Sequence, residues 1–237
     1  MNIRNKKFPI FCPLSFTADL NKLSSELNLL KDKWLKILPN SMWIRKPIIP
    51  YSYQIADKEH YDNCENTDRV DGKPVNWDGK YKTWLGMSLT HIPINPATKY
   101  GSVRFRTMKD WIWDDSLDIP YTKEVISRLP YKELNVVRLM VIEPGGFGPL
   151  HKDDFDDDLW EKNDIVSTTI TISHGGSPLK FVHNDKMIDV KDDVFFFKDS
   201  VYHGVPPVKS QRMILRINGK VDYQKYNELM QFDKSIW

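Results

Sequence analysis

Six short, β-rich segments follow one another between residues 134 and 219 with no helical pattern between them. They are rich in Val, Ile, Thr and Phe, and turn-forming residues bound each one. The segments are residues 134–142, 166–173, 179–183, 186–190, 193–198 and 212–219. Strands without intervening helices pair antiparallel, so this run predicts a β-sandwich or jelly roll and argues against a Rossmann-type sheet. Asn184–Asp185 between two of the segments predicts a hairpin turn.

Helical patterns flank this run. Residues 17–38 carry apolar side chains at three- and four-residue steps, which predicts an amphipathic helix with Thr17 as its N-cap. A second helix is expected over 122–129, and a third in the C-terminal segment 221–237. We therefore expect one domain over residues 1–237, with a helical and irregular cover at 1–80 and the β core at about 81–220.

Composition excludes several classes of protein. The 34 basic and 32 acidic residues give a net charge of +2, so nothing favours a nucleic-acid or membrane partner. No stretch approaches the roughly 18 apolar residues of a membrane span, and the apolar run at the N-terminus is too short for a signal peptide. Two isolated cysteines, Cys12 and Cys64, indicate neither a disulfide framework nor a thiolate zinc site. A cytoplasmic location is predicted.

A histidine and a carboxylate follow the first of the β segments. The stretch EPGGFGPLHKDD delivers His151 and Asp153 after a Gly- and Pro-rich turn. In an extended chain residues i and i+2 point the same way, so both can meet one ion. His203 follows another apolar segment, 52 residues later. Two imidazoles and one carboxylate form a facial triad suited to non-haem Fe(II), although the acidic run after Asp153 also fits a solvated loop.

Arginines on the last β segment suggest an anionic ligand. Arg212 lies nine residues after His203, and period 2 places Arg212, Ile214 and Arg216 on one face. A guanidinium facing inward in a β-sandwich requires a partner, because an unpaired buried charge is costly. A dicarboxylate would provide it by bidentate pairing.

Residues from about 134 to 218 resemble the double-stranded β-helix core of Fe(II)/2-oxoglutarate-dependent oxygenases. The motifs VVRLMVIEPGGFGPLHKD, DVFFFKDSVYHGV and RMILRI are most similar to the aspartyl/asparaginyl β-hydroxylase-like group, which includes bacterial proline hydroxylases. The resemblance implies a mainly β jelly-roll fold with flanking helices. The site residues that it implies are His151, Asp153 and His203 for iron, Arg212 for 2-oxoglutarate, and Arg216, Arg138 and Thr169 or Thr171 as further contacts.

The implied reaction uses Fe(II), 2-oxoglutarate and O2 to hydroxylate an amino acid, an amino-acid derivative or a peptidyl side chain, with release of succinate and CO2. A small-molecule or peptide substrate is therefore the expected partner. Two rivals remain open at this point. One is a cupin-like metalloprotein without 2-oxoglutarate chemistry, which would not need Arg212. The other is a non-catalytic β-sandwich binding protein, in which the histidines and Asp153 come together by coincidence.

Overall fold

The computed structural model describes residues 8–37, 69–70, 73–74, 84–91, 111–151, 164–198 and 201–237. Its helices are α1 (Leu20–Asn28), α3 (Pro120–Ser127) and α5 (Tyr223–Leu229), with short 3-10 turns at Lys31–Lys33 and Phe232–Lys234. The strands outside the central run are β1 (Phe11–Pro13), β2 (Leu35–Ile37), β3 (Arg69–Val70), β4 (Lys73–Pro74), β5 (Trp84–Ser88), β6 (Thr90–His91) and β7 (Ile112–Trp113).

Eight consecutive strands form the centre of the molecule. They are β8 (Tyr131–Ile142), β9 (Gly148–His151), β10 (Ile165–His174), β11 (Leu179–His183), β12 (Lys186–Val190), β13 (Val194–Phe197), β14 (His203–Val205) and β15 (Arg212–Val221). One sheet has the order β1-β13-β10-β15-β8-β5-β2, and the other has the order β12-β11-β14-β9. The eight strands thus divide four and four between two antiparallel sheets, which is a jelly roll and confirms the predicted fold class.

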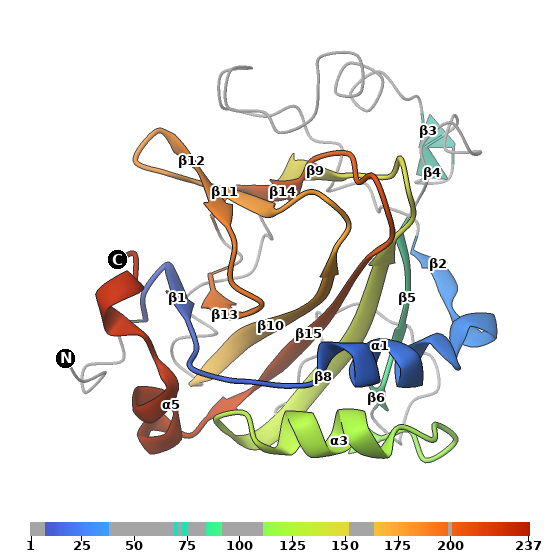
Figure 1. Ribbon diagram of the computed structural model, residues 1–237, viewed down its shortest axis with the longest axis horizontal. Coiled ribbons are helices and arrows are strands. Elements are labelled where there is room, and N and C mark those ends of the chain that lie inside the picture. The colour runs from blue at the N-terminus through green and yellow to red at the C-terminus, as the bar shows by residue number, and fades with distance from the viewer. Residues whose placement is uncertain are drawn as a thin grey trace.

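The two faces of the seven-stranded sheet bury different cores. Its outer face packs Val137, Leu139 and Val141 of β8 against the helices, where Leu23 and Leu27 of α1 contribute. Figure 1 shows α1 and α3 together on this side and β9, β11, β12 and β14 on the other. The inner face packs aromatic side chains between the sheets, and the residues concerned include Phe11, Phe181, Phe195, Phe197 and Ile142.

All six predicted β segments are strands, and two further strands lie between them. The hairpin turn at Asn184–Asp185 is confirmed, because both residues have positive φ, 48° and 57°. The sequence did not predict β9 or β14, which are only four and three residues long. Each is extended because it pairs with the other, a contact between segments far apart in sequence.

The long helix predicted over residues 17–38 is wrong beyond Asn28. The chain ends α1 there, and residues 35–37 form β2, which pairs with β5 at the sheet edge. The N-cap is Asp19 and not Thr17, since the Asp19 carboxylate accepts from the Lys22 N–H at 3.0 Å. Pairing along the open edge of β5 competes with helix propensity, which is a weak local preference.

The remaining helices lie close to their predicted positions. The second begins at Pro120, two residues before the expected start, and proline suits the first helical turn because its missing N–H would be unpaired there. The C-terminal helix is capped by Asp222, whose carboxylate accepts from the N–H groups of Gln224 and Lys225. No helix in the described part of the chain has the length and apolar character needed to cross a bilayer.

Candidate metal and anion site

Strands β9 and β14 make His151 and His203 neighbours. His203 begins β14 and pairs in register with His151, the last residue of β9. Directly opposed residues of antiparallel strands share one face of the sheet, with Cα atoms about 4.5–5.5 Å apart. The two histidines are 52 residues apart in sequence. The strand register nevertheless places their backbones close enough for both side chains to bind one metal ion.

The third predicted ligand, Asp153, lies outside the described residues, and so does the side chain of His151. Among the side chains that the structure does describe, no group of three His, Cys, Asp or Glu residues is arranged to hold a metal ion. The complete triad of His151, Asp153 and His203 therefore stays a prediction.

The imidazole of His203 is buried and held by the backbone just before β14. Its Nδ1 lies 2.8 Å from the carbonyl oxygen of Val201. Because a carbonyl can only accept, Nδ1 carries a proton, and a neutral ring in this tautomer has its lone pair at Nε2. Metal-binding histidines are oriented by this kind of hydrogen bond from the second ring nitrogen. His203 thus has the tautomer that suits a metal ligand.

An aromatic ring connects His203 with one of the predicted arginines. Phe197 contacts the His203 imidazole edge to face, with ring centroids 4.8 Å apart. The guanidinium carbon of Arg216 lies 4.9 Å from the centre of the same Phe197 ring. Arg216 also donates a hydrogen bond of 2.9 Å to the hydroxyl oxygen of Thr169. A single side chain, Phe197, therefore contacts both the His203 imidazole and the Arg216 guanidinium.

Three of the predicted cosubstrate contacts form one row across the sheet. Arg216 on β15 lies opposite Thr169 on β10 and opposite Arg138 on β8. All three residues are on the inner face, the one that carries Ile142 in the core between the sheets. Like charges placed directly opposite one another repel, so two guanidiniums in register are stable only with compensating polar or anionic groups nearby.

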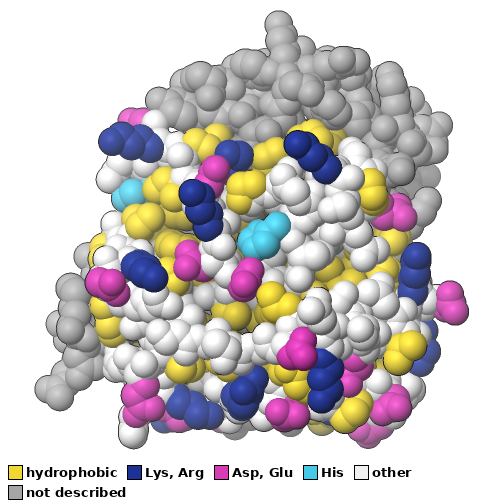
Figure 2. All heavy atoms as spheres, in the orientation of Figure 1, with side chains coloured by type: hydrophobic (Ala, Val, Ile, Leu, Met, Phe, Trp, Pro, Cys, Tyr) yellow, Lys and Arg dark blue, Asp and Glu magenta, His cyan; other side chains and the backbone are white. Residues whose placement is uncertain are grey.

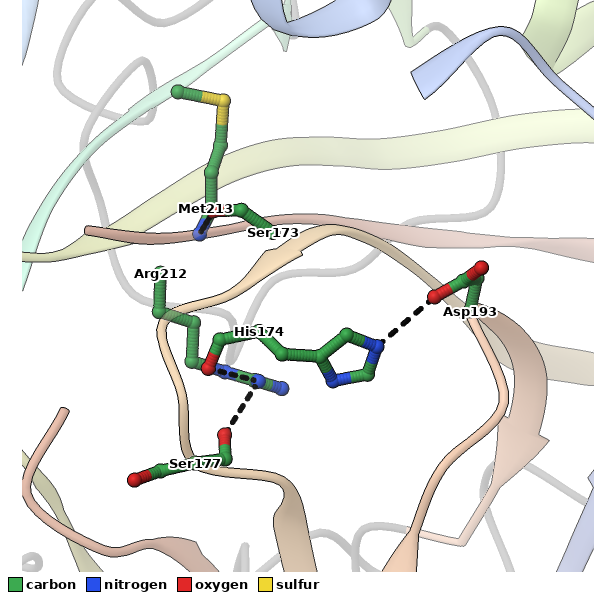
Figure 3. A network of polar contacts seen from close by, with 6 residues as sticks. All are labelled: Ser173, His174, Ser177, Asp193, Arg212 and Met213. Carbon is green, nitrogen blue, oxygen red and sulfur yellow. Dashed lines mark hydrogen bonds and ion pairs between the residues drawn. The ribbon is translucent and has the colours of Figure 1, made fainter. Parts of the chain in front are cut away.

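Arg212 has a different environment from Arg216. It is 2% exposed and donates hydrogen bonds to two backbone carbonyl oxygens, of His174 at 3.3 Å and Ser177 at 3.1 Å. Figure 3 shows the guanidinium between His174 and Ser177, and the His174 ring directed toward Asp193, with Nε2 2.9 Å from Oδ1. Burial lowers the pKa of Arg212 to about 10. Sequence reasoning expected an anionic partner here, whereas the contacts are those of a residue that fixes a turn.

The same turn is tied to β15 by a serine. The Ser173 hydroxyl donates to the carbonyl of Gln211 at 2.7 Å and accepts from the N–H of Met213 at 3.0 Å. These bonds span the irregular register between β10 and β15, and Figure 3 shows the one between Ser173 and Met213. Arg212 and Ser173 together tie the turn that follows β10 to the start of β15.

A buried hydroxyl near the arginine row has no partner among the described residues. Thr171 Oγ1 is buried and makes no hydrogen bond within that part of the chain. Thr171 lies two residues from Thr169 and opposite Ile214, so it shares the inner face with Arg216. Buried polar groups are nearly always paired, by protein, water or ligand. Thr171 thus supplies a hydrogen-bonding group of the kind that an anionic ligand would use.

Sequence reasoning missed Phe197 and Val201. The run VFFF was recognised as a strand, but its alternation was not used. Period 2 separates Phe196, which joins the outer core, from Phe195 and Phe197, which join the inner one. That signal alone predicts an aromatic side chain facing into the barrel six residues before His203.

Figure 2 shows Lys and Arg side chains mixed with Asp and Glu over the face in view, with hydrophobic side chains between them. No large block of one sign lies on the described part of this face. That distribution agrees with the net charge of +2. The expectation of a small-molecule or peptide partner stays a prediction.

No family model matches the chain, and no curated protein matches its sequence. Solved structures give weak similarities. A prolyl-4-hydroxylase from Pseudomonas putida is 22% identical with a TM-score of 0.31, over 42% of this chain and 57% of that one. The chain thus spans little more than half the length of that enzyme.

Two further structures are similar to this chain. A prolyl hydroxylase from Trichoplax adhaerens, solved with a peptide of hypoxia inducible factor, is 11% identical with a TM-score of 0.45 and covers 96% of this chain and 90% of its own. An oxidoreductase of the 2-oxoglutarate–Fe(II) oxygenase family from Burkholderia pseudomallei is 9% identical with a TM-score of 0.38, covering 59% of this chain and 69% of its own. The assignment of function therefore depends on the residues described above.

Proposed function

We propose that the protein is an Fe(II)/2-oxoglutarate-dependent hydroxylase of the aspartyl/asparaginyl β-hydroxylase-like kind. The observation that carries this proposal is the register that opposes His203 to His151 within a jelly roll. Asp153, two residues after His151, is the natural third ligand because an acid at this spacing completes a facial triad. The substrate is an amino acid, an amino-acid derivative or a peptidyl side chain.

The described residues fit the metal and its cosubstrate. The Nδ1 atom of His203 is hydrogen-bonded to the Val201 carbonyl, so Nε2 would be the ring atom that binds the ion. The inner-face row of Arg138, Arg216 and Thr169 suits a carboxylate. Fe(II) held by two histidines and a carboxylate keeps open positions for a 2-oxo acid and O2 and supplies the oxidising chemistry.

Arg216 is our choice for the distal carboxylate of 2-oxoglutarate. Sequence spacing favoured Arg212, but the guanidinium of Arg212 donates to two backbone carbonyls of the turn that follows β10. Arg216 lies one aromatic ring away from His203 and already donates to Thr169. A ligand that reaches from the metal to a cation would therefore end at Arg216, where the Thr171 hydroxyl is also available.

The protein would also keep water away from this reaction. Phe181 and Phe195 are 0% exposed and Phe197 is 2% exposed, and all three belong to the core between the sheets. Exclusion of water strengthens the pairing of a carboxylate with a guanidinium, since screening is lower in an apolar surrounding.

Metal binding tests this proposal directly. Anaerobic titration with Fe(II) should show one site per chain, and His203→Ala should weaken it by more than about 100-fold, because loss of a ligand exceeds the 10- to 100-fold effect of outer-shell changes. His183→Ala is the matched control, since His183 ends β11 in the same sheet and lies beside the hairpin turn. Equal metal affinity in both variants would reject the ligand assignment.

Cosubstrate binding separates the hydroxylase from its rivals. The metal-loaded protein should bind 2-oxoglutarate, or its unreactive analogue N-oxalylglycine, in a calorimetric titration. Screening amino acids and peptides by mass spectrometry should then find a gain of one oxygen atom coupled to succinate formation. A protein that binds metal but neither of these acids would instead be a cupin-like metalloprotein without 2-oxoglutarate chemistry.

A further inference from the structure

One buried ring contacts both halves of the proposed site. Phe197 lies 4.8 Å from the His203 imidazole, ring centre to ring centre, and 4.9 Å from the Arg216 guanidinium carbon. The guanidinium stacks over the ring, and the imidazole meets it at an interplanar angle of 77°. Each contact fixes one rotamer relative to the same aromatic plane.

The Phe197 ring is itself held firmly. It is 2% exposed, on a strand with neighbours on both sides. Its backbone pairs with Phe11 on β1, and its ring lies 6.4 Å from that of Phe195, centre to centre. Protein interiors are close-packed, so a ring in this position has little freedom to shift. Movement of His203 relative to Arg216 would therefore require Phe197 to give up one of its two contacts.

We propose that Phe197 is a positioning residue that sets the separation between the metal ligand His203 and the anion-binding guanidinium of Arg216. The inference rests on the proposed function, in which a 2-oxo diacid bridges these two groups. A diacid binds well only when one end reaches the metal and the other end reaches Arg216. Because Phe197 sets the distance between these two partners, it determines which length of diacid binds best.

The test compares Phe197→Leu with Phe195→Leu. Phe195 is 0% exposed, lies on the same strand and belongs to the same inner core, but its described ring contacts are with Phe11 and Phe197. Both variants remove a buried ring, so a general loss of packing would affect them alike. Phe197→Met is a second substitution that removes the ring, and its flexible side chain can fill the space that the ring leaves.

The readout is the Kd of three acids for the Mn(II)-loaded protein, measured by calorimetry without turnover. The acids are oxaloacetate, 2-oxoglutarate and 2-oxoadipate, which differ by one methylene each. The wild type should prefer 2-oxoglutarate to both neighbours. In Phe197→Leu and Phe197→Met we expect the Kd of 2-oxoglutarate to rise roughly tenfold, because a cation–π contact and a ring contact are lost. The difference in Kd between 2-oxoglutarate and the two other acids should become smaller. Phe195→Leu should keep the preference.

The outcomes distinguish this inference from the proposed function. If the wild type binds the acids but the two Phe197 variants keep both the Kd of 2-oxoglutarate and the length preference, the positioning role is wrong while the hydroxylase proposal stands. The same holds if Phe195→Leu narrows the preference as much as Phe197→Leu does. If the wild type binds neither Mn(II) nor any of the acids, the proposed function fails and this inference fails with it.

Discussion

The guanidinium of Arg212 donates to the carbonyl oxygen of Ser177 at 3.1 Å and, through the same nitrogen, to that of His174 at 3.3 Å. Arg216 is on the same face of β15, four residues further on, yet it stacks on Phe197 and donates to a side chain, Thr169. One arginine therefore fixes a turn, whereas the other lies beside the candidate metal ligand.

This contrast predicts opposite effects for two matched substitutions. Arg212→Met keeps much of the aliphatic stem but leaves two carbonyls without their donor, which should lower the free energy of unfolding by about 2–4 kcal/mol. Binding of 2-oxoglutarate by the folded fraction should hardly change. Arg216→Met should do the reverse, with stability within about 1 kcal/mol of wild type and a 2-oxoglutarate Kd raised by at least about tenfold.

Urea denaturation and calorimetric titration measure the two quantities separately. An Arg212→Met protein of wild-type stability that no longer binds 2-oxoglutarate would return the anchoring role to Arg212.

Local pattern predicted most of the jelly roll and part of the site. The alternation of β8 placed Val137, Leu139 and Val141 on one face, and these residues are buried under the helices. The strands β9 and β14 could not be predicted in this way, because GPLH and HGV are too short to show a period. They exist through pairing between distant segments, and that pairing sets the register of His203 on His151. Nothing local encodes it.

The predicted end of the first helix was wrong for a related reason. The leucine spacing of residues 17–38 was correct for the core, since Leu23, Leu27, Leu30 and Trp34 are all buried. The same spacing cannot show that residues 35–37 have a strand, β5, to pair with.

Gly175 and Gly145 offer a test of the packing between β15 and the turn that follows β10. Both have positive φ, at 64° and 82°. A Cβ on Gly175 would lie 2.7 Å from the carbonyl oxygen of Ser210 and 2.9 Å from Arg212 Cβ, whereas a Cβ on Gly145 would meet no atom within 4 Å. We expect Gly145→Ala to cost about 1–2 kcal/mol from backbone strain alone. Gly175→Ala should cost about 3–5 kcal/mol, because overpacking adds to the strain.

Urea unfolding of both variants measures the difference between their free energies of unfolding. Equal losses would mean that the turn at Gly175 shifts away from β15 without cost, contrary to the contacts of Arg212.

Helix α3 is capped by a residue of α1. The Glu26 carboxylate accepts from the N–H of Tyr121 at 2.8 Å, and from the N–H and hydroxyl of Thr122 at 2.7 and 2.6 Å. Ile119 at the N-cap position provides no side-chain acceptor. Glu26→Ala should therefore lower the free energy of unfolding by about 2 kcal/mol, since it removes a cap and leaves partly buried donors unpaired.

Glu228→Ala is the control for this prediction, because Glu228 is exposed on α5 and its described bond is to Gln224. We expect a loss below about 0.5 kcal/mol there. A similar, small loss in both variants would show that α3 does not depend on α1 for its cap.

Two buried tyrosines predict how stability falls at alkaline pH. Burial raises the pKa of Tyr131 and of Tyr226 above the ordinary value. Above about pH 10 the unfolded chain loses these protons while the native protein keeps them, so stability decreases as pH rises through that value. Arg212, whose pKa is lowered to about 10, acts in the opposite direction but is common to all the variants compared.

Replacing each tyrosine by phenylalanine should flatten the pH dependence by up to about 1.4 kcal/mol per pH unit above pH 10. At neutral pH the two variants should differ. Tyr131 donates to the Thr168 hydroxyl at 2.7 Å, so Tyr131→Phe should cost about 1 kcal/mol. The Tyr226 hydroxyl is buried with no hydrogen bond among the described residues, so Tyr226→Phe should be neutral or stabilising. Urea unfolding at pH 7 and pH 10.5 measures both effects, and a Tyr226→Phe protein that is less stable at pH 7 would reveal a partner for that hydroxyl.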